Sequence, residues 1–170
     1  SELSLAGLQD KLLLVDTGTA WGRPVNGFPS THILKLDNAV LRGVVRAEHT
    51  CLRLAAAAGL TASASQLIAV GDAECIVVER FDRRRDGSQV VRIHQEDTCQ
   101  ALGLNPDRHE GRGKYQQTGG PSLRSIAEVL SAWGSSPEHD LQALLDRIVF
   151  TVAIGDADVH GKNIALLHTE

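Results

Sequence analysis

The sequence contains no methionine, and only 4% of its residues are aromatic. Its three cysteines, Cys51, Cys75 and Cys99, lie far apart without a C-x-x-C pair, which argues against disulfides or a zinc-thiolate site. No run approaches the roughly 18 apolar residues of a membrane span, and the start lacks a secretory pattern. We therefore expect a cytoplasmic protein with no membrane partner, and the start at Ser1 suggests a piece of a longer chain.

A large excess of basic residues is also missing. The 17 basic and 21 acidic residues give a net charge of -4 and are spread along the chain. This pattern gives no electrostatic footprint for nucleic acid, so DNA binding by the chain itself is not expected. The 170 residues with 42% apolar content are enough for one sizeable core or two small lobes.

Strand patterns come first and helical patterns second. Short β-favouring runs predict strands at residues 9–15, 31–36, 66–70, 75–79 and 89–93, and a Leu- and Ala-rich run predicts a helix over 46–58 capped by Gly59. Further helices are predicted at residues 96–102, 123–133 and 139–154, with a mobile loop over 105–120. This order indicates an α+β fold with two lobes, residues 1–82 and 83–170.

The most informative run is Ile154-Gly-Asp-Ala-Asp-Val-His-Gly-Lys-Asn163, which contains the spacing D-x-x-x-x-N. In phosphoryl transfer, a carboxylate such as Asp158 accepts the proton of the attacking hydroxyl, and the amide oxygen of Asn163 coordinates a cation. His160 and Lys162 add polar and basic groups where a polyphosphate would lie. The alternative is that Asp158 caps a turn and Asn163 starts a strand.

Two further segments suit a nucleotide. Small residues in Ser4-Leu-Ala-Gly-Leu-Gln-Asp-Lys11 allow backbone amides to approach phosphate oxygens, to which Lys11 would add charge. Lys35 ends an apolar strand, and Glu48 follows at the start of the next helix, so the two are expected to pair beside the phosphates. The plainer interpretation is a turn, a lysine that reaches solvent and a glutamate that favours a helix N-terminus.

The run Val77-Val-Glu-Arg-Phe-Asp82 ends the last strand of the first half. An extended chain at such a junction exposes backbone donors and acceptors, which suits contacts with adenine. Without that context the run is only a strand that ends in charges.

Together these segments resemble the HipA-like kinases, bacterial serine/threonine kinases that act as toxins of toxin–antitoxin modules. The resemblance covers nearly the whole chain. The matching residues are Ser4–Lys11, Pro29–Lys35, Val78–Arg83, His94–Asp97, Cys99–Gly103, Lys114-Tyr115, Gly119–Ser122 and Ile154–Asn163.

The resemblance implies a protein-kinase-like fold, with a β-rich nucleotide-binding lobe and a helical lobe that ends in the catalytic loop. It implies ATP and Mg²⁺ as cofactors, Asp158 as the catalytic base, Asn163 as a metal ligand and Ser4 as an autophosphorylated residue, with Ser1 a second candidate. The implied ATP-binding residues are Ala6, Gly7, Gln9, Lys11, Lys35, Glu79, Arg80, Phe81, His160, Lys162 and Asn163.

The implied partners are a protein substrate, either a translation factor or an aminoacyl-tRNA synthetase, and a helix-turn-helix antitoxin of the HipB type. DNA would be reached only through that antitoxin. The family's further metal-binding aspartate would lie beyond Glu170, and Gln116 stands where the family has Glu. These departures lead us to expect weak nucleotide binding and no phosphorylation by the 170 residues alone.

Three alternatives remain at this stage. A truncated or inactive kinase-like module would bind nucleotide or an antitoxin without catalysis, and an α+β interaction domain would do neither. The seven histidines could suggest a metal hydrolase, but they show no H-x-x-x-H or similar pattern, so a metal hydrolase is not favoured.

Overall fold

The computed structural model describes residues 10–37, 42–87 and 89–168. The chain divides into two compact units, Ser1–Arg92 and Ile93–Glu170. In this division the hairpin of β6 (Arg83–Asp86) and β7 (Gln89–Arg92) belongs to the first unit, whereas the sequence placed residues 83–92 in the second lobe.

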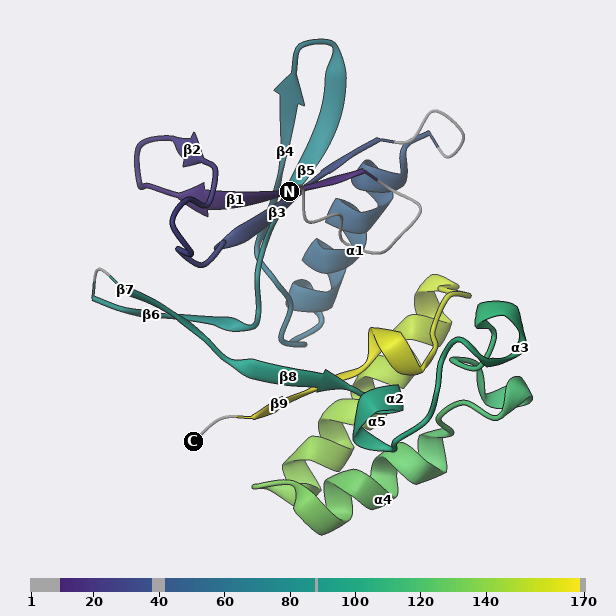
Figure 1. Cartoon of the computed structure of the whole chain (residues 1–170). Coiled ribbons are helices and arrows are strands. Elements are labelled where there is room, and N and C mark those ends of the chain that lie inside the picture. Colours follow the sequence, from purple (N-terminus) through teal and green to yellow (C-terminus); the bar gives the residue numbers. More distant parts are fainter. Residues whose placement is uncertain (1–9, 38–41, 88, 169–170) are drawn as a thin grey trace. The chain divides into compact units, whose positions relative to one another are not determined.

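The first unit is built on a five-stranded antiparallel sheet with the order β2-β1-β3-β5-β4 (Figure 1). All four of its longer strands fall where alternating or apolar runs predict them. The strands are β1 (Lys11–Asp16), β2 (Trp21–Gly22), β3 (His32–Leu36), β4 (Ser65–Val70) and β5 (Ala73–Glu79).

Successive side chains of a strand point to opposite faces of the sheet, and in this unit the two faces differ. One face carries the apolar cluster of Leu14, Leu34, Cys75 and Val77, each at most 9% exposed. The other face carries Lys35 and lies against helix α1 (Val44–Ala57), which contacts β4 and β5. Sheet register therefore places Lys35 on the helix side.

Helix α1 confirms the predicted helix, with its start two residues earlier than expected. It ends in a Schellman motif: the Gly59 amide donates to the Ala56 carbonyl and the Leu60 amide to the Ala55 carbonyl. Gly59 has φ 85°, a left-handed conformation that costs glycine little. The sequence signal for this cap was correct.

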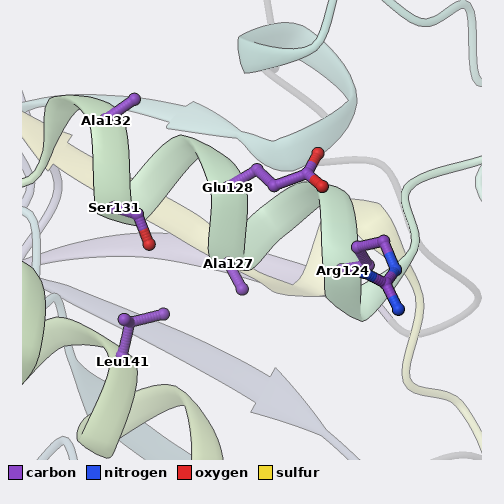
Figure 2. Close-up of a pocket in the computed structure, with 6 residues that line it drawn as sticks. All are labelled: Arg124, Ala127, Glu128, Ser131, Ala132 and Leu141. Atoms are coloured by element: carbon purple, nitrogen blue, oxygen red, sulfur yellow. The ribbon is translucent and has the colours of Figure 1, made fainter.

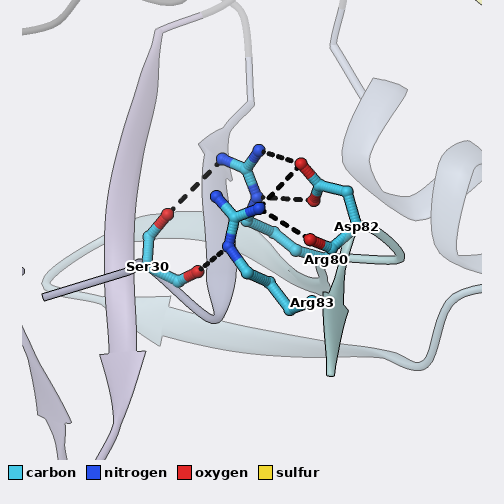
Figure 3. Close-up of polar contacts among 4 residues, drawn as sticks. All are labelled: Ser30, Arg80, Asp82 and Arg83. Carbon is cyan, nitrogen blue, oxygen red and sulfur yellow. Dashed lines mark hydrogen bonds and ion pairs between the residues drawn. The ribbon is translucent and has the colours of Figure 1, made fainter. Parts of the chain in front are cut away.

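A buried ionic cluster follows β5 (Figure 3). The Arg80 guanidinium donates to both Asp82 carboxylate oxygens, Nε to Oδ1 at 2.9 Å and Nη2 to Oδ2 at 2.7 Å. Arg83 Nη1 lies 2.8 Å from Asp82 Oδ2, and Arg83 Nε donates to the Ser30 carbonyl at 2.8 Å. These contacts fix the loop before β3 to the chain that leaves β5.

The second unit contains a short strand pair and a set of helices. Helices α4 and α5 are consecutive, pack against each other and are joined by a short turn (Figure 1). The elements are β8 (His94–Asp97), α2 (Thr98–Ala101), α3 (Arg108–Gly111), α4 (Leu123–Trp133), α5 (Pro137–Ile154) and β9 (Ala165–His168).

Helix α4 has the predicted bounds and the predicted cap, since the Ser122 hydroxyl accepts from the Ser125 amide at 3.0 Å. The helix predicted over residues 96–102 was wrong in its first half. His94–Asp97 pairs with β9 as a strand, and Asp97 then caps α2 by accepting from the Gln100 amide at 2.9 Å. Pairing with a strand some 70 residues away overrode the local helical pattern.

The segment expected to be a loop over residues 105–120 contains a 3₁₀ turn at Gln116–Thr118 and the short element α3, in which His109 and Glu110 have left-handed φ angles of 55° and 60°. Thr118 lies at the end of the 3₁₀ turn, and its hydroxyl hydrogen-bonds to the Tyr115 carbonyl at 3.1 Å. The polar composition of this segment thus supplies local hydrogen bonds, and its mobility stays a prediction.

The Asp82 cluster yields a test of stability. Burial alone would raise the pKa of Asp82, but the Arg80 and Arg83 guanidiniums hold it below its usual range. In the full-length protein, Asp82→Asn should lower the free energy of unfolding by roughly 3 kcal/mol at neutral pH, because it leaves two largely buried guanidiniums without their counter-charge. Denaturant titration measures this loss.

The pH dependence has a definite sign. The pKa of Asp82 is lower in the folded protein than in the unfolded chain, where it is roughly 3.9. Its ionised carboxylate therefore stabilises the fold above that pH, and this stabilisation is lost as the pH falls through the pKa of the folded state. The difference between parent and Asp82→Asn should therefore shrink below about pH 4. The control is Glu74→Gln, whose partner Arg46 is 69% exposed, and it should leave the melting temperature unchanged. Equal effects of the two substitutions would show that the Asp82 cluster stabilises the fold no more than an exposed ion pair.

Candidate functional site

A loop between α5 and β9 carries the predicted catalytic residues. Helix α5 ends at Gly155, which has φ 72°, and β9 begins at Ala165. Between them a 3₁₀ turn spans Gly161–Asn163. The loop is short, and its two ends are set by regular elements, so Asp158 and Asn163 project from a defined backbone.

The Asp158 carboxylate is 74% exposed. Its Oδ1 accepts a hydrogen bond from the Tyr115 hydroxyl at 3.3 Å and lies 3.7 Å from His160 Nε2. Its backbone amide donates to Asp156 Oδ1 at 3.0 Å, which shapes the turn. The carboxylate is thus accessible and held through one oxygen.

Asn163 is tied to the same residue. Its Nδ2 donates to the Asp158 carbonyl oxygen at 2.6 Å. Because the amide nitrogen faces the loop, Oδ1 is the atom left to coordinate a cation. The structure therefore brings Asp158 and Asn163 together, as the D-x-x-x-x-N spacing indicates.

His160 lies beneath the loop and is only 8% exposed. Its ring meets the Tyr115 ring edge-on, with centroids 5.2 Å apart and planes at 87°. Burial, reinforced by the nearby Lys114 charge, lowers the pKa of His160, which favours the neutral ring. Its Nδ1 is buried and has no hydrogen-bond partner within the described part of the chain.

Gly161 fixes the loop to its surroundings. Its amide donates to the Lys114 carbonyl at 3.0 Å, and its carbonyl accepts from the buried Thr98 hydroxyl at 2.7 Å. A Cβ atom at this position would lie 2.5 Å from Pro121 Cγ and 2.9 Å from Cys99 Sγ. Only glycine fits here without displacing buried atoms.

Lys162 has a partner other than a phosphate. Its Nζ donates to Asp97 Oδ2 at 2.9 Å, and this hydrogen bond raises the pKa of Lys162. Asp97 also caps α2, so the ion pair joins the loop between α5 and β9 to the start of that helix. The predicted ATP contact of Lys162 would have to compete with this pair.

In the first unit, Lys35 Nζ donates to Glu48 Oε1 and forms an ion pair between β3 and α1. Lys11 lies directly opposite Lys35 in the β1–β3 register. Burial, followed by the charge of Lys35, lowers the pKa of Lys11, while Glu48 opposes that shift. The two lysines on adjacent strands therefore repel each other, and a bound anion would reduce this repulsion.

Two backbone amides of the segment predicted to contact adenine already donate hydrogen bonds within the protein. The Glu79 amide donates to the Ala64 carbonyl at 2.8 Å, and the Arg80 amide donates to the Thr31 carbonyl at 2.9 Å. The Arg80 side chain is only 14% exposed because it lies in the Asp82 cluster. A backbone donor for adenine would therefore come from Phe81, whose side chain is also exposed.

The predicted phosphate-loop residues Ser4, Ala6, Gly7 and Gln9 lie outside the described residues. Their assignments remain predictions.

A surface hollow lies elsewhere in the second unit (Figure 2). It is broad and open, and it belongs to α4 and the start of α5. None of the predicted nucleotide or catalytic residues lines it. The lining residues are Arg124, Ala127, Glu128, Ser131, Ala132 and Leu141.

Several residues that shape the loop had no predicted role. Tyr115 and Pro121 lie in motifs that carry the family resemblance, but the sequence did not show what they contact. Thr98 was assigned to the interior of a helix, whereas its hydroxyl holds Gly161. The only local signal was the cluster of glycine and proline at 119–121, where Pro121 packs on the loop.

The class of protein follows from the fold. The chain is similar to the solved structure of HipA from Shewanella oneidensis MR-1 in complex with HipB and its operator DNA, with a TM-score of 0.78 and 30% identity. The match covers 98% of this chain and 40% of that chain. The expected α+β, HipA-like fold class is therefore confirmed.

The family follows from the sequence profile. The HipA-like C-terminal domain profile matches residues 3–170, and the chain belongs to this family. "Putative kinase Y4mE" of Sinorhizobium fredii is 41% identical over 169 residues, which make up 99% of this chain and 39% of that protein. "Serine/threonine-protein kinase toxin HipA" of Shewanella oneidensis is 32% identical over 180 residues, 98% of this chain and 40% of that protein.

The chain thus spans about two-fifths of the length of these relatives. Among the described residues, no helix combines the length and the apolar character needed to span a bilayer.

Gly161 yields a second test. In the full-length protein, Gly161→Ala should cost roughly 1–3 kcal/mol of unfolding free energy, because its methyl group would overlap Pro121 and Cys99. Thermal and chemical denaturation measure the loss. The matched control is Gly22→Ala, where the nearest atom to a Cβ lies at 3.7 Å and no comparable loss is expected. A Gly161→Ala protein as stable as the parent would show that the loop backbone is not fixed in this way.

Proposed function

We propose that this chain carries the ATP-binding and catalytic residues of an ATP-dependent serine/threonine protein kinase of the HipA-like toxin family. The observation that carries the proposal is the loop that presents an exposed Asp158 carboxylate and the Asn163 amide, whose Nδ2 donates to the backbone carbonyl of Asp158. Phosphoryl transfer needs these two groups side by side.

In the proposed reaction, Asp158 orients the hydroxyl of a substrate serine or threonine and accepts its proton. Oδ1 is engaged by Tyr115, so Oδ2 is the oxygen that receives the proton. Asn163 Oδ1 would hold Mg²⁺, which when bound neutralises charge on the phosphates of ATP. His160 was also predicted as an ATP contact, but its unpaired Nδ1 is buried, so such a contact would require its ring to move.

The first unit supplies the nucleotide-binding groups in this proposal. Lys35, positioned by Glu48, would bind the phosphates, and Lys11 would add a second charge from the neighbouring strand. Phe81 would supply the backbone contact to adenine. Glu79, Arg80 and Lys162 were also predicted as ATP contacts, but their described hydrogen bonds support a mainly structural contribution.

The partners are proposals of the same kind. One similar structure is HipA with HipB and operator DNA, which supports a HipB-type helix-turn-helix antitoxin as a partner here. The relative named as a serine/threonine-protein kinase toxin supports a protein substrate, for which a translation factor or aminoacyl-tRNA synthetase is our proposal. Autophosphorylation of Ser4 in the phosphate loop would regulate the activity.

Two substitutions test the division of roles in the full-length protein. Asp158→Asn should reduce phosphoryl transfer by at least about 100-fold and leave the ATP dissociation constant nearly unchanged, since it removes the proton acceptor.

Lys35→Ala should weaken ATP binding by about tenfold or more, because it removes the positive charge that would bind the phosphates. Radiolabel transfer and calorimetric titration with Mg²⁺-ATP measure the two effects.

The control for both is Arg46→Ala, an exposed residue of α1 on the same helix as Glu48. It should change neither quantity. If Asp158→Asn left transfer intact, Asp158 would not be the base. If ATP bound but no transfer occurred in the parent, the chain would belong to a nucleotide-binding module without catalysis.

Tyr115 is proposed as a positioning residue. Removing its hydrogen bond to a charged acceptor should cost roughly 1.5 kcal/mol, which is about a tenfold drop in kcat. Tyr115→Phe should therefore lower kcat without raising KM for ATP. A change in KM alone, with kcat unaltered, would contradict this role.

A further inference from the structure

We propose that His94 and Glu96 of β8, together with His168 of β9, form a binding site for a divalent transition-metal ion of the Zn²⁺ type. The site lies apart from the Asp158–Asn163 loop residues and does not depend on the proposed kinase activity. No short motif marks it, because the sequence separates His168 from Glu96 by 72 positions.

The strand register puts the three side chains on one face. His94 is the direct cross-strand partner of His168 in the antiparallel pair. Glu96 is two residues along β8 from His94, so its side chain points to the same face. From these positions, a diagonal contact brings Glu96 to His168.

The ligand atoms are close enough to share one ion. One ligand atom from each residue lies within 4.8 Å of those of the other two. His168 Nε2 and Glu96 Oε2 are 3.1 Å apart, and the two imidazole centroids are 4.9 Å apart. Zn²⁺ binds such atoms at about 2.0–2.2 Å, which puts tetrahedral ligands roughly 3.3–3.5 Å from one another. Small side-chain rotations would reach that geometry.

The chemistry of the donors selects the ion. Two imidazoles and one carboxylate suit Zn²⁺, Co²⁺, Ni²⁺ or Cu²⁺, whereas Mg²⁺ and Ca²⁺ prefer oxygen ligands alone. The His168 side chain is 51% exposed and that of Glu96 is 38% exposed, so an ion can reach them from solvent. A fourth position would remain for water or for a ligand from a partner.

The strands that carry the site also hold the catalytic loop. β8 leads into Asp97, which caps α2 and pairs with Lys162. β9 begins two residues after Asn163. A two-stranded ladder of four residue pairs is weak by itself, and an ion bound across it would fasten the exit of the loop.

Zinc titration of the full-length protein tests the site, using metal-free protein without a histidine tag and an excess of Mg²⁺. The parent should bind one equivalent of Zn²⁺ at this site. Each of the variants His94→Ala, Glu96→Gln and His168→Ala should fail to bind it or should bind it at least about tenfold more weakly. Calorimetry measures the stoichiometry, and Co²⁺ absorption in the visible range reports tetrahedral coordination. Zn²⁺ should also raise the melting temperature of the parent by more than that of each variant.

The matched control is His139→Ala on α5, whose side chain is 83% exposed. It should bind as many Zn²⁺ ions as the parent. Glu96→Gln keeps the shape of the side chain, so a loss of binding by a variant that melts like the metal-free parent cannot be ascribed to unfolding. The proposal fails if the parent binds no Zn²⁺ at micromolar concentration, or if the three variants bind it as the parent does.

Discussion

The candidate site depends on the burial of one glycine. Gly161 sits against Pro121 and Cys99, donates to the Lys114 carbonyl and accepts from Thr98, so its backbone is held from three directions. Asp158, His160, Lys162 and Asn163 all lie within three residues of it. A loop fixed by its backbone leaves the side chains of Asp158 and Asn163 free for chemistry while it limits where they can go.

Charge pairing separates structural from chemical roles. Arg80 and Arg83 form ion pairs with Asp82, and Lys162 forms one with Asp97. These three side chains therefore stabilise the fold. Asp158 differs, because its hydrogen-bonded neighbour is a neutral hydroxyl and its carboxylate is largely exposed. A carboxylate without a tightly bound cation keeps its ability to accept a proton, as a general base requires.

The sequence predicted most elements whose signals are local. Ser122 and Gly59 marked the ends of α4 and α1 correctly, because caps are hydrogen-bonded to residues within one turn. It failed for β8, which exists through pairing with β9 at the far end of the chain. The same reason explains why the D-x-x-x-x-N spacing found Asp158 and Asn163, but no spacing revealed Tyr115, Thr98 or the pair of His94 with His168. Contacts between distant segments leave no periodic trace.

The two ends of the loop between α5 and β9 are held by different means, and this difference matters for its rigidity. At its start, Gly155 ends α5 in a left-handed turn, and the Asp156 amide donates back to the Thr151 carbonyl at 3.1 Å. At its other end, the loop leads into β9, which is held by its ladder with β8, and the Thr98 amide donates to the Ile164 carbonyl just before that strand. A helix of 18 residues is a firmer support than a four-residue strand pair, so the loop is least constrained where it enters β9. Ordering of that strand pair therefore governs how well Asn163 keeps its position beside Asp158.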